Sequence, residues 1–123
     1  MSWDFNENIP IYQQIIEHIK FSIATGEYKA GNKIMPVREL AAAAKVNPNT
    51  MQKALCELER EGLLYTQRTA GRFVTDDKQR ITELRRSLAD EHICLFIEKM
   101  TQLGFTSCEA ADELAKHIKG ETE

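Results

Sequence analysis

Apolar positions between residues 34 and 58 follow two helical repeats joined by a short break. In the first repeat, residues 37–45, the apolar or small side chains are Val37, Leu40, Ala41 and Ala44, at the spacing of one helical face. The break follows directly, where Asn47 can cap a new helix and Pro48 suits its first turn. The second helix is expected to reach about residue 61, with an apolar face formed by Met51, Ala54, Leu55 and Leu58.

This pair predicts a helix-turn-helix, in which the polar N-terminal part of the second helix enters the major groove of DNA. An ordinary antiparallel helix pair in an α-rich core would show the same apolar spacing. The next segment favours DNA binding, because residues 64–67 and 72–75 are typical of two short strands around a basic turn. A basic hairpin directly after a recognition helix indicates a wing.

The flanking segments predict a mostly α fold with this small β wing. An expected helix begins at residues 8–10 and runs to about residue 25. Its apolar face repeats isoleucine, and Gly26 ends it. Residues 78–103 predict one long helix, because neither glycine nor proline interrupts them. Thr106 and Glu109 then form a capping box for a last helix.

The chain is expected to divide into a winged helix-turn-helix domain, residues 1–76, and a C-terminal two-helix region, residues 77–123. The second region is too small to be stable as an isolated core. Its apolar stripes therefore need a cover, and a second copy of the chain is the simplest source. The expected dimer-interface residues are Leu95, Phe96, Met100, Leu103, Leu114 and Ile118.

Composition indicates a globular protein, with 42% apolar residues and mixed charge. The chain contains neither a membrane-spanning apolar run nor an N-terminal secretory signal, so the cytoplasm is the expected location. The net charge is −3, although residues 1–78 hold 10 Lys and Arg against 10 Asp and Glu. Phosphate binding needs only a local cluster of cations, and the expected members are Arg38, Lys53, Arg68 and Arg72.

Catalytic and metal chemistry have little support in this sequence. The three histidines are scattered, and neither a nucleophile motif nor a phosphate loop is present. Cys56, Cys94 and Cys108 are too widely spaced for a zinc site or a disulfide framework, and buried free thiols are expected. We therefore expect a protein that is not an enzyme and that holds neither cofactor nor metal.

In these helix, turn and wing segments the chain resembles the GntR family of bacterial transcription regulators, and most of all its small YtrA-type branch. The resemblance covers roughly residues 9–75. The matching positions are Pro10, Ile11, Tyr12, Gln13, Gln14, Ile15, Ile23, Gly26, Gly31, Val37, Arg38, Glu39, Leu40, Ala41, Val46, Asn49, Thr50, Ala54, Leu58, Glu61, Gly62, Leu63, Gly71, Phe73 and Val74.

Two departures from the family pattern bear on the site. Before the leading helix the family usually has Leu-Pro-Ser, where this chain has Ile34, Met35 and Pro36, so one phosphate-binding hydroxyl is absent. The wing usually has Gly-x-Gly, but Thr69 replaces the first glycine. Because threonine tolerates a positive φ poorly, the wing tip is expected to differ from that of the family.

The expected DNA-binding residues combine these observations with the resemblance. They are Arg38, Asn47, Asn49, Thr50, Lys53, Arg68, Gly71 and Arg72. Arg38 matches a family arginine that can reach a phosphate or a guanine edge, and the alternative is a surface ion pair. Capping alone explains Asn47 equally well. The wing arginines suit either a narrow minor groove or simple phosphate attraction, and Gly71 is expected to serve backbone geometry.

The resemblance implies a homodimeric repressor of its own operon and of nearby transporter genes, bound to double-stranded DNA at a palindromic operator. A small-molecule effector of unknown identity, bound near Phe96, Met100 and Phe105, is a second interpretation of residues that dimer packing explains better. The alternative function is a helical protein-interaction module whose winged domain binds a protein. An enzyme in the tail would need a sizeable polar pocket, for which the tail is short.

Overall fold

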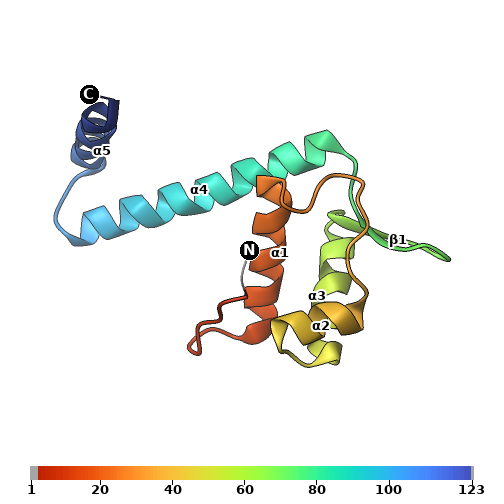
Figure 1. The fold of residues 1–123 in the computed structure, drawn as a ribbon. Coiled ribbons are helices and arrows are strands. Elements are labelled where there is room, and N and C mark those ends of the chain that lie inside the picture. Colours follow the sequence, from red (N-terminus) through yellow and green to blue (C-terminus); the bar gives the residue numbers. More distant parts are fainter. Residues whose placement is uncertain (1–2, 123) are drawn as a thin grey trace. The chain divides into compact units, whose positions relative to one another are not determined.

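The computed structural model describes the backbone of residues 3–122 and the side chains of residues 3–120. The elements follow in the order α1 (Ile11–Thr25), α2 (Val37–Ala44), α3 (Pro48–Arg60), β1 (Leu64–Gln67), β2 (Gly71–Val74), α4 (Lys78–Gln102) and α5 (Ser107–Thr122) (Figure 1). The prediction of a mostly α fold with a two-stranded wing is confirmed. The predicted helix boundaries agree with the observed ones within about a residue, except that α1 begins at Ile11, one to three residues after its predicted start.

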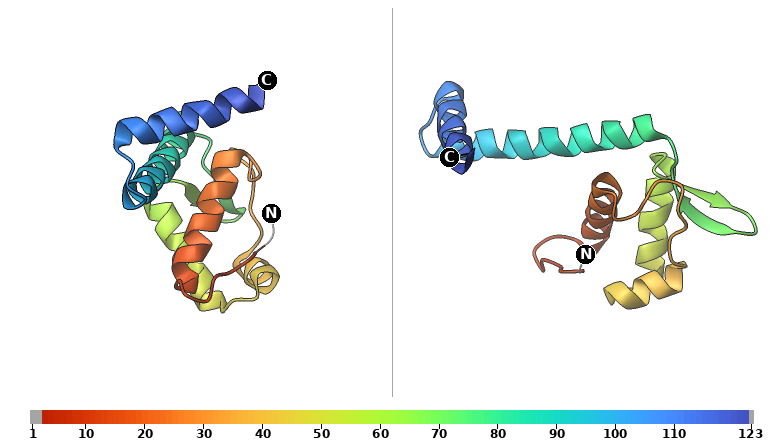
Figure 2. Two further views of the ribbon diagram at one scale, coloured as in Figure 1. Left: turned by 90° about the vertical axis from the view of Figure 1, so that its left-hand side faces the viewer. Right: turned by 45° about the horizontal axis from the view of Figure 1, so that its top comes forward.

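The core of the N-terminal unit lies where α1 and α2 pack against α3 (Figure 2). From α1 it takes isoleucines spaced four residues apart, as the helical repeat requires. From α3 it takes the whole predicted apolar face. The fully buried members are Ile15, Ile19, Met51, Ala54, Leu55 and Leu58, and Ile23, Leu40 and Ala41 are within 2% of full burial.

Local signals set the ends of these helices. Gly26 follows α1 in the left-handed conformation, and its N–H donates to the Ile23 carbonyl. Lys45 takes the same conformation after α2, with a φ of 59°. The Asn47 side chain then accepts a hydrogen bond from the backbone N–H of Asn49 at 2.8 Å, so the predicted cap of the second helix is confirmed.

The wing is an antiparallel hairpin in which Thr66 pairs with Arg72 and Tyr65 pairs with Phe73. It projects away from α1, α2 and α3 in Figure 1 and in the right view of Figure 2. Its second strand also pairs with the segment before α2, because Ile34 N–H donates to the Arg72 carbonyl at 3.0 Å. Strand β2 is thereby hydrogen-bonded to β1 on one side and to the segment before α2 on the other. An isolated two-stranded ribbon lacks this second contact.

The chain forms two compact units, residues 1–85 and residues 86–123. The division falls nine residues after the boundary expected from the sequence, because the first turns of α4 belong to the N-terminal unit. There Leu84 is buried, the Arg80 guanidinium donates to the Glu61 carbonyl at 3.1 Å, and Arg85 reaches the Ala24 carbonyl at 3.4 Å.

The C-terminal unit consists of the remainder of α4 and of α5. The expected capping box is present, since the Glu109 N–H donates to the Thr106 hydroxyl at 3.1 Å and the Thr106 N–H donates to the Glu109 carboxylate at 2.9 Å. The hydrogen bond from the Thr106 backbone N–H, together with that of the Thr106 hydroxyl, holds the pKa of Glu109 below its usual value. The expected dimer-interface side chains are exposed or half-buried in the single chain: Leu95, Phe96, Met100, Leu103, Leu114 and Ile118.

The expectation of buried thiols is wrong, because Cys56, Cys94 and Cys108 are all exposed. Cys56 follows the buried Leu55, but one residue turns an α-helix by about 100°, which places the thiol on the outer face beside Gln52. Sequence neighbours of apolar residues need not share their face. Across residues 3–122, no helix combines the length and apolarity needed to cross a membrane.

Candidate nucleic-acid interface

The first part of the candidate interface is the start of α2. Arg38 is the second residue of this helix and its side chain is exposed. Pro36 occupies the cap position and makes no side-chain cap hydrogen bond, in agreement with the hydroxyl expected to be absent there. The first helical turn thus has no side-chain cap from Pro36, and uncapped N–H groups at a helix N-terminus can bind an anion.

The second part is the N-terminal half of α3. Asn49 and Lys53 are exposed and Thr50 is half-buried, whereas Met51 and Ala54 of the same helix are fully buried. The helix therefore presents one polar stripe to its surroundings and one apolar stripe to the core. This is the division that a recognition helix requires.

The wing tip lies beyond the last paired residues of the hairpin. The Ala70 N–H donates to the Gln67 carbonyl at 3.1 Å and closes the turn, with Arg68 and Thr69 exposed between them. Among the non-glycine residues that the structure describes, only Lys45 has a positive φ. The substitution at Thr69 therefore introduces no backbone strain, because the left-handed geometry of the tip is provided by Gly71.

Gly71 has a φ of 115°, which an L side chain adopts only with strain. A Cβ atom at this position would lie 2.8 Å from Cε and 3.4 Å from Nζ of Lys33. The aliphatic part of the lysine thus crosses the glycine, and its ammonium group lies beside the wing. The predicted geometric role of Gly71 is consistent with this close approach.

Arg72 lies on the wing but faces α3. Its Nε–H donates to Oε1 of Glu59 at 2.6 Å, and the Thr66 hydroxyl donates to the same oxygen. The Arg72 side chain is only 14% exposed. Burial raises the pKa of Glu59, but the hydrogen bonds from Thr66 and Arg72 outweigh burial and lower it below the usual value.

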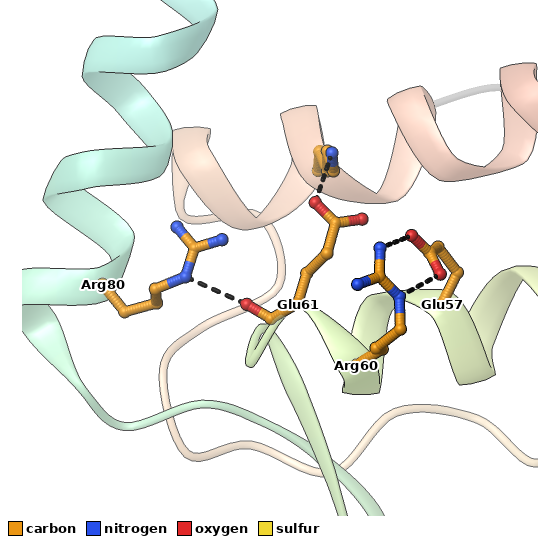
Figure 3. Close-up of polar contacts among 5 residues, drawn as sticks. Glu57, Arg60, Glu61 and Arg80 are labelled. Atoms are coloured by element: carbon orange, nitrogen blue, oxygen red, sulfur yellow. Dashed lines mark hydrogen bonds and ion pairs between the residues drawn. The ribbon is translucent and has the colours of Figure 1, made fainter.

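The C-terminal end of α3 is attached to two other helices, as Figure 3 shows. Lys20 of α1 pairs with the Glu61 carboxylate at 2.9 Å, and the Glu61 carbonyl accepts the bond from Arg80 of α4. Glu57 and Arg60 pair within α3, which lowers the pKa of Glu57 and raises that of Arg60. The recognition helix is thus anchored at the end remote from its polar stripe.

Three residues of this region are not among the DNA-binding residues expected from the sequence. Lys33 lies beside Gly71, Lys45 is exposed in the turn before α3, and Glu59 holds the wing. Lys45 could have been found, since it immediately precedes the predicted break. Lys33 and Glu59 could not, because their roles depend on contacts with residues far along the chain.

Comparison with known proteins supports this geometry. The sequence pattern of the bacterial regulatory proteins of the gntR family matches residues 11–74. The HTH-type transcriptional regulator YhcF of Bacillus subtilis is 36% identical over 100% of this chain and 98% of its own length. The HTH-type transcriptional repressor YtrA of the same organism is 35% identical over 92% of this chain and 82% of its own length.

Solved structures agree with the sequence comparison. A GntR family transcriptional regulator from Listeria monocytogenes has a TM-score of 0.84 and 40% identity, covering 91% of this chain and 98% of that one. The AraR DNA-binding domain, solved in complex with operator ORX1, has a TM-score of 0.52 and 32% identity, covering 61% of this chain and 92% of that one. These relatives are regulators and not enzymes, as expected from the sequence. The chain therefore belongs to the GntR family of DNA-binding transcriptional regulators, and to its small YtrA-type branch.

Proposed function

We propose that this protein is a homodimeric repressor that binds a palindromic operator through α3 and the wing, and that it controls its own operon and nearby transporter genes. The observation that carries the proposal is the polar stripe of α3, exposed next to a hairpin that is fixed to the same helix. The name of the relative YtrA supports repression, and the operator complex of AraR supports the mode of binding.

The contacts divide by chemistry. Asn49 and Thr50 lie at the front of α3 and carry groups that read base edges, since an asparagine can bind adenine through both amide atoms. Arg38, Lys53 and Arg68 supply positive charge to phosphates or to a groove edge. Asn47 acts first as the cap, because its Oδ1 already accepts the Asn49 N–H. Arg72 and Gly71 contribute through the conformation of the wing.

A second copy of the chain is the proposed cover for the C-terminal unit. Leu103 is 73% exposed, Ile118 is 53% exposed and Leu114 is 47% exposed, and apolar exposure of this extent in two adjacent helices is typical of an interaction surface. A two-fold dimer would present two recognition helices, and these match two half-sites about one helical turn, roughly 34 Å, apart.

The test is a selection from random duplex DNA on the purified protein, at low and at high salt. Wild type is expected to recover a palindrome, and Arg38→Ala is expected to bind it at least about tenfold more weakly. Arg86→Ala is the matched control, because Arg86 is also an exposed helical arginine but lies in the C-terminal unit. It should bind as wild type does.

Two outcomes would contradict the proposal. Recovery of a single asymmetric site would contradict the dimer on a palindrome. Weak binding without sequence preference, equal in wild type and Arg38→Ala, would contradict sequence-specific regulation and favour a module that binds a protein.

A further inference from the structure

The contact between α3 and the wing converges on a single oxygen atom. Oε1 of Glu59 accepts the Nε–H of Arg72, which lies on β2, and the hydroxyl of Thr66, which lies on β1. Thr66 and Arg72 are directly paired across the hairpin, so their side chains leave the same face of the ribbon. One carboxylate of the recognition helix therefore holds both strands of the wing.

This arrangement removes Arg72 from the set of exposed cations. The Arg72 side chain is 14% exposed and that of Glu59 is 28% exposed. By contrast, Arg60, which lies on α3 next to Glu59, has a side chain that is 72% exposed. A partly buried guanidinium beside a carboxylate is neutralised locally and lacks a clear path to a phosphate. The charge of Arg72 is thus directed toward the protein.

We infer that Glu59 is a positioning residue for DNA recognition, which sets the angle of the wing to α3 by holding Arg72 and Thr66. The inference rests on the proposed DNA-binding function. The exposed Arg68 lies at the tip of the hairpin, two residues beyond Thr66. A small rotation of the ribbon at Glu59 therefore moves the tip arginine relative to the polar stripe of α3.

The experiment measures how affinity for the selected palindrome depends on salt, beside affinity for an unrelated duplex of the same length. Each phosphate contact adds about 0.9 to the slope of log affinity against log salt. Slopes are compared in an Arg68→Ala background, where a displaced tip arginine cannot change them, and specificity ratios are measured without that change. If Arg72 positions the wing, Arg72→Met leaves this slope unchanged. Glu59→Gln releases Arg72 and is expected to steepen the slope by up to about 0.9. Both variants are expected to lower the ratio of specific to unrelated binding about tenfold, the size of one lost base contact.

Two further variants separate positioning from charge. Glu57→Gln removes the same charge from the same helix but frees Arg60, whose ion pair lies within α3, so it should keep the wild-type specificity ratio. The exchange Glu59→Arg with Arg72→Glu rebuilds the ion pair in reverse and should recover specificity that each single reversal loses. Thermal unfolding establishes that every variant tested is folded.

A slope reduced by about 0.9 in Arg72→Met would overturn the inference, because Arg72 would then contact a phosphate in the complex. An unchanged specificity ratio in Glu59→Gln would overturn it as well. If wild type selects no operator, the proposed function fails, and amide hydrogen exchange in residues 64–74 still tests the contact. Glu59→Gln should speed exchange there, whereas Glu57→Gln should not, and equal protection in both would refute the role of Glu59.

Discussion

Arg72 of the wing donates its Nε–H to Glu59 of the recognition helix at 2.6 Å, across thirteen residues of chain. The sequence pattern predicts that the wing and the recognition helix both face DNA. Here a charged residue from each part faces the other. The pair therefore couples the conformation of the wing to the helix that carries the proposed base-reading residues, and its strength can be tested without DNA.

The contribution of Glu59 to stability should depend on pH. The pKa of this carboxyl is lowered in the folded protein, so the contribution is fully present above the unfolded value of about 4.3 and is lost as the pH falls through the lower folded value. The free energy of unfolding in urea, measured from pH 7 to pH 3, should differ between wild type and Glu59→Gln at neutral pH. The difference should shrink below about pH 4, and a difference that grows on acidification would contradict the assignment.

Replacement of Gly71 by alanine should destabilise the protein by about 1–3 kcal/mol, because a side chain is strained at a φ of 115°. The Cβ would also meet Lys33. Gly26→Ala is the matched comparison, since Gly26 has a φ of 85° with nothing within 4 Å of its Cβ. Denaturant unfolding of both variants, and of Gly71→Ala combined with Lys33→Ala, separates strain from contact. If Lys33→Ala recovers none of the loss, the lysine contact has no energetic role.

The cap at Asn47 can be separated from a DNA contact at the same residue. Asn47→Ala should cost about 1 kcal/mol of stability because the Asn49 N–H loses its acceptor. Asn47→Ser retains a capping oxygen and should keep most of that stability. Operator affinity measured on both variants then assigns the residue. Weak binding by the well-folded serine variant would show that the amide also reads DNA.

The exposed apolar face of the C-terminal unit should be required for dimer formation. Leu114→Glu places a charge on this face and is expected to yield monomers in sedimentation analysis and to weaken operator binding. Lys116→Gln, an equal change in net charge on the exposed Lys116 of the same helix, should leave the assembly unchanged. A stable dimer in Leu114→Glu would place the interface elsewhere.

The positions of the helices, their ends and the buried face of α3 follow from residue patterns within a few positions of one another in the sequence. The helical repeat of α3 placed its apolar residues in the core, and Asn47, Gly26 and the Thr106–Glu109 box set helix ends within one turn. Such features depend on φ preferences and on neighbours three or four residues away, so they can be read directly from the sequence. The family resemblance extended this reading to the polar face of the recognition helix.

Tertiary structure alone decided which side chains the folded chain brings together. The pairing of Glu57 with Arg60, three residues on, can be read from the local sequence, but nothing there shows that Glu59 holds the wing. The crossing of Lys33 over Gly71 likewise depends on the segment before α2 pairing with β2. Each outcome depends on contacts between elements that are distant in the sequence, and a local residue pattern does not show which distant elements will pack together.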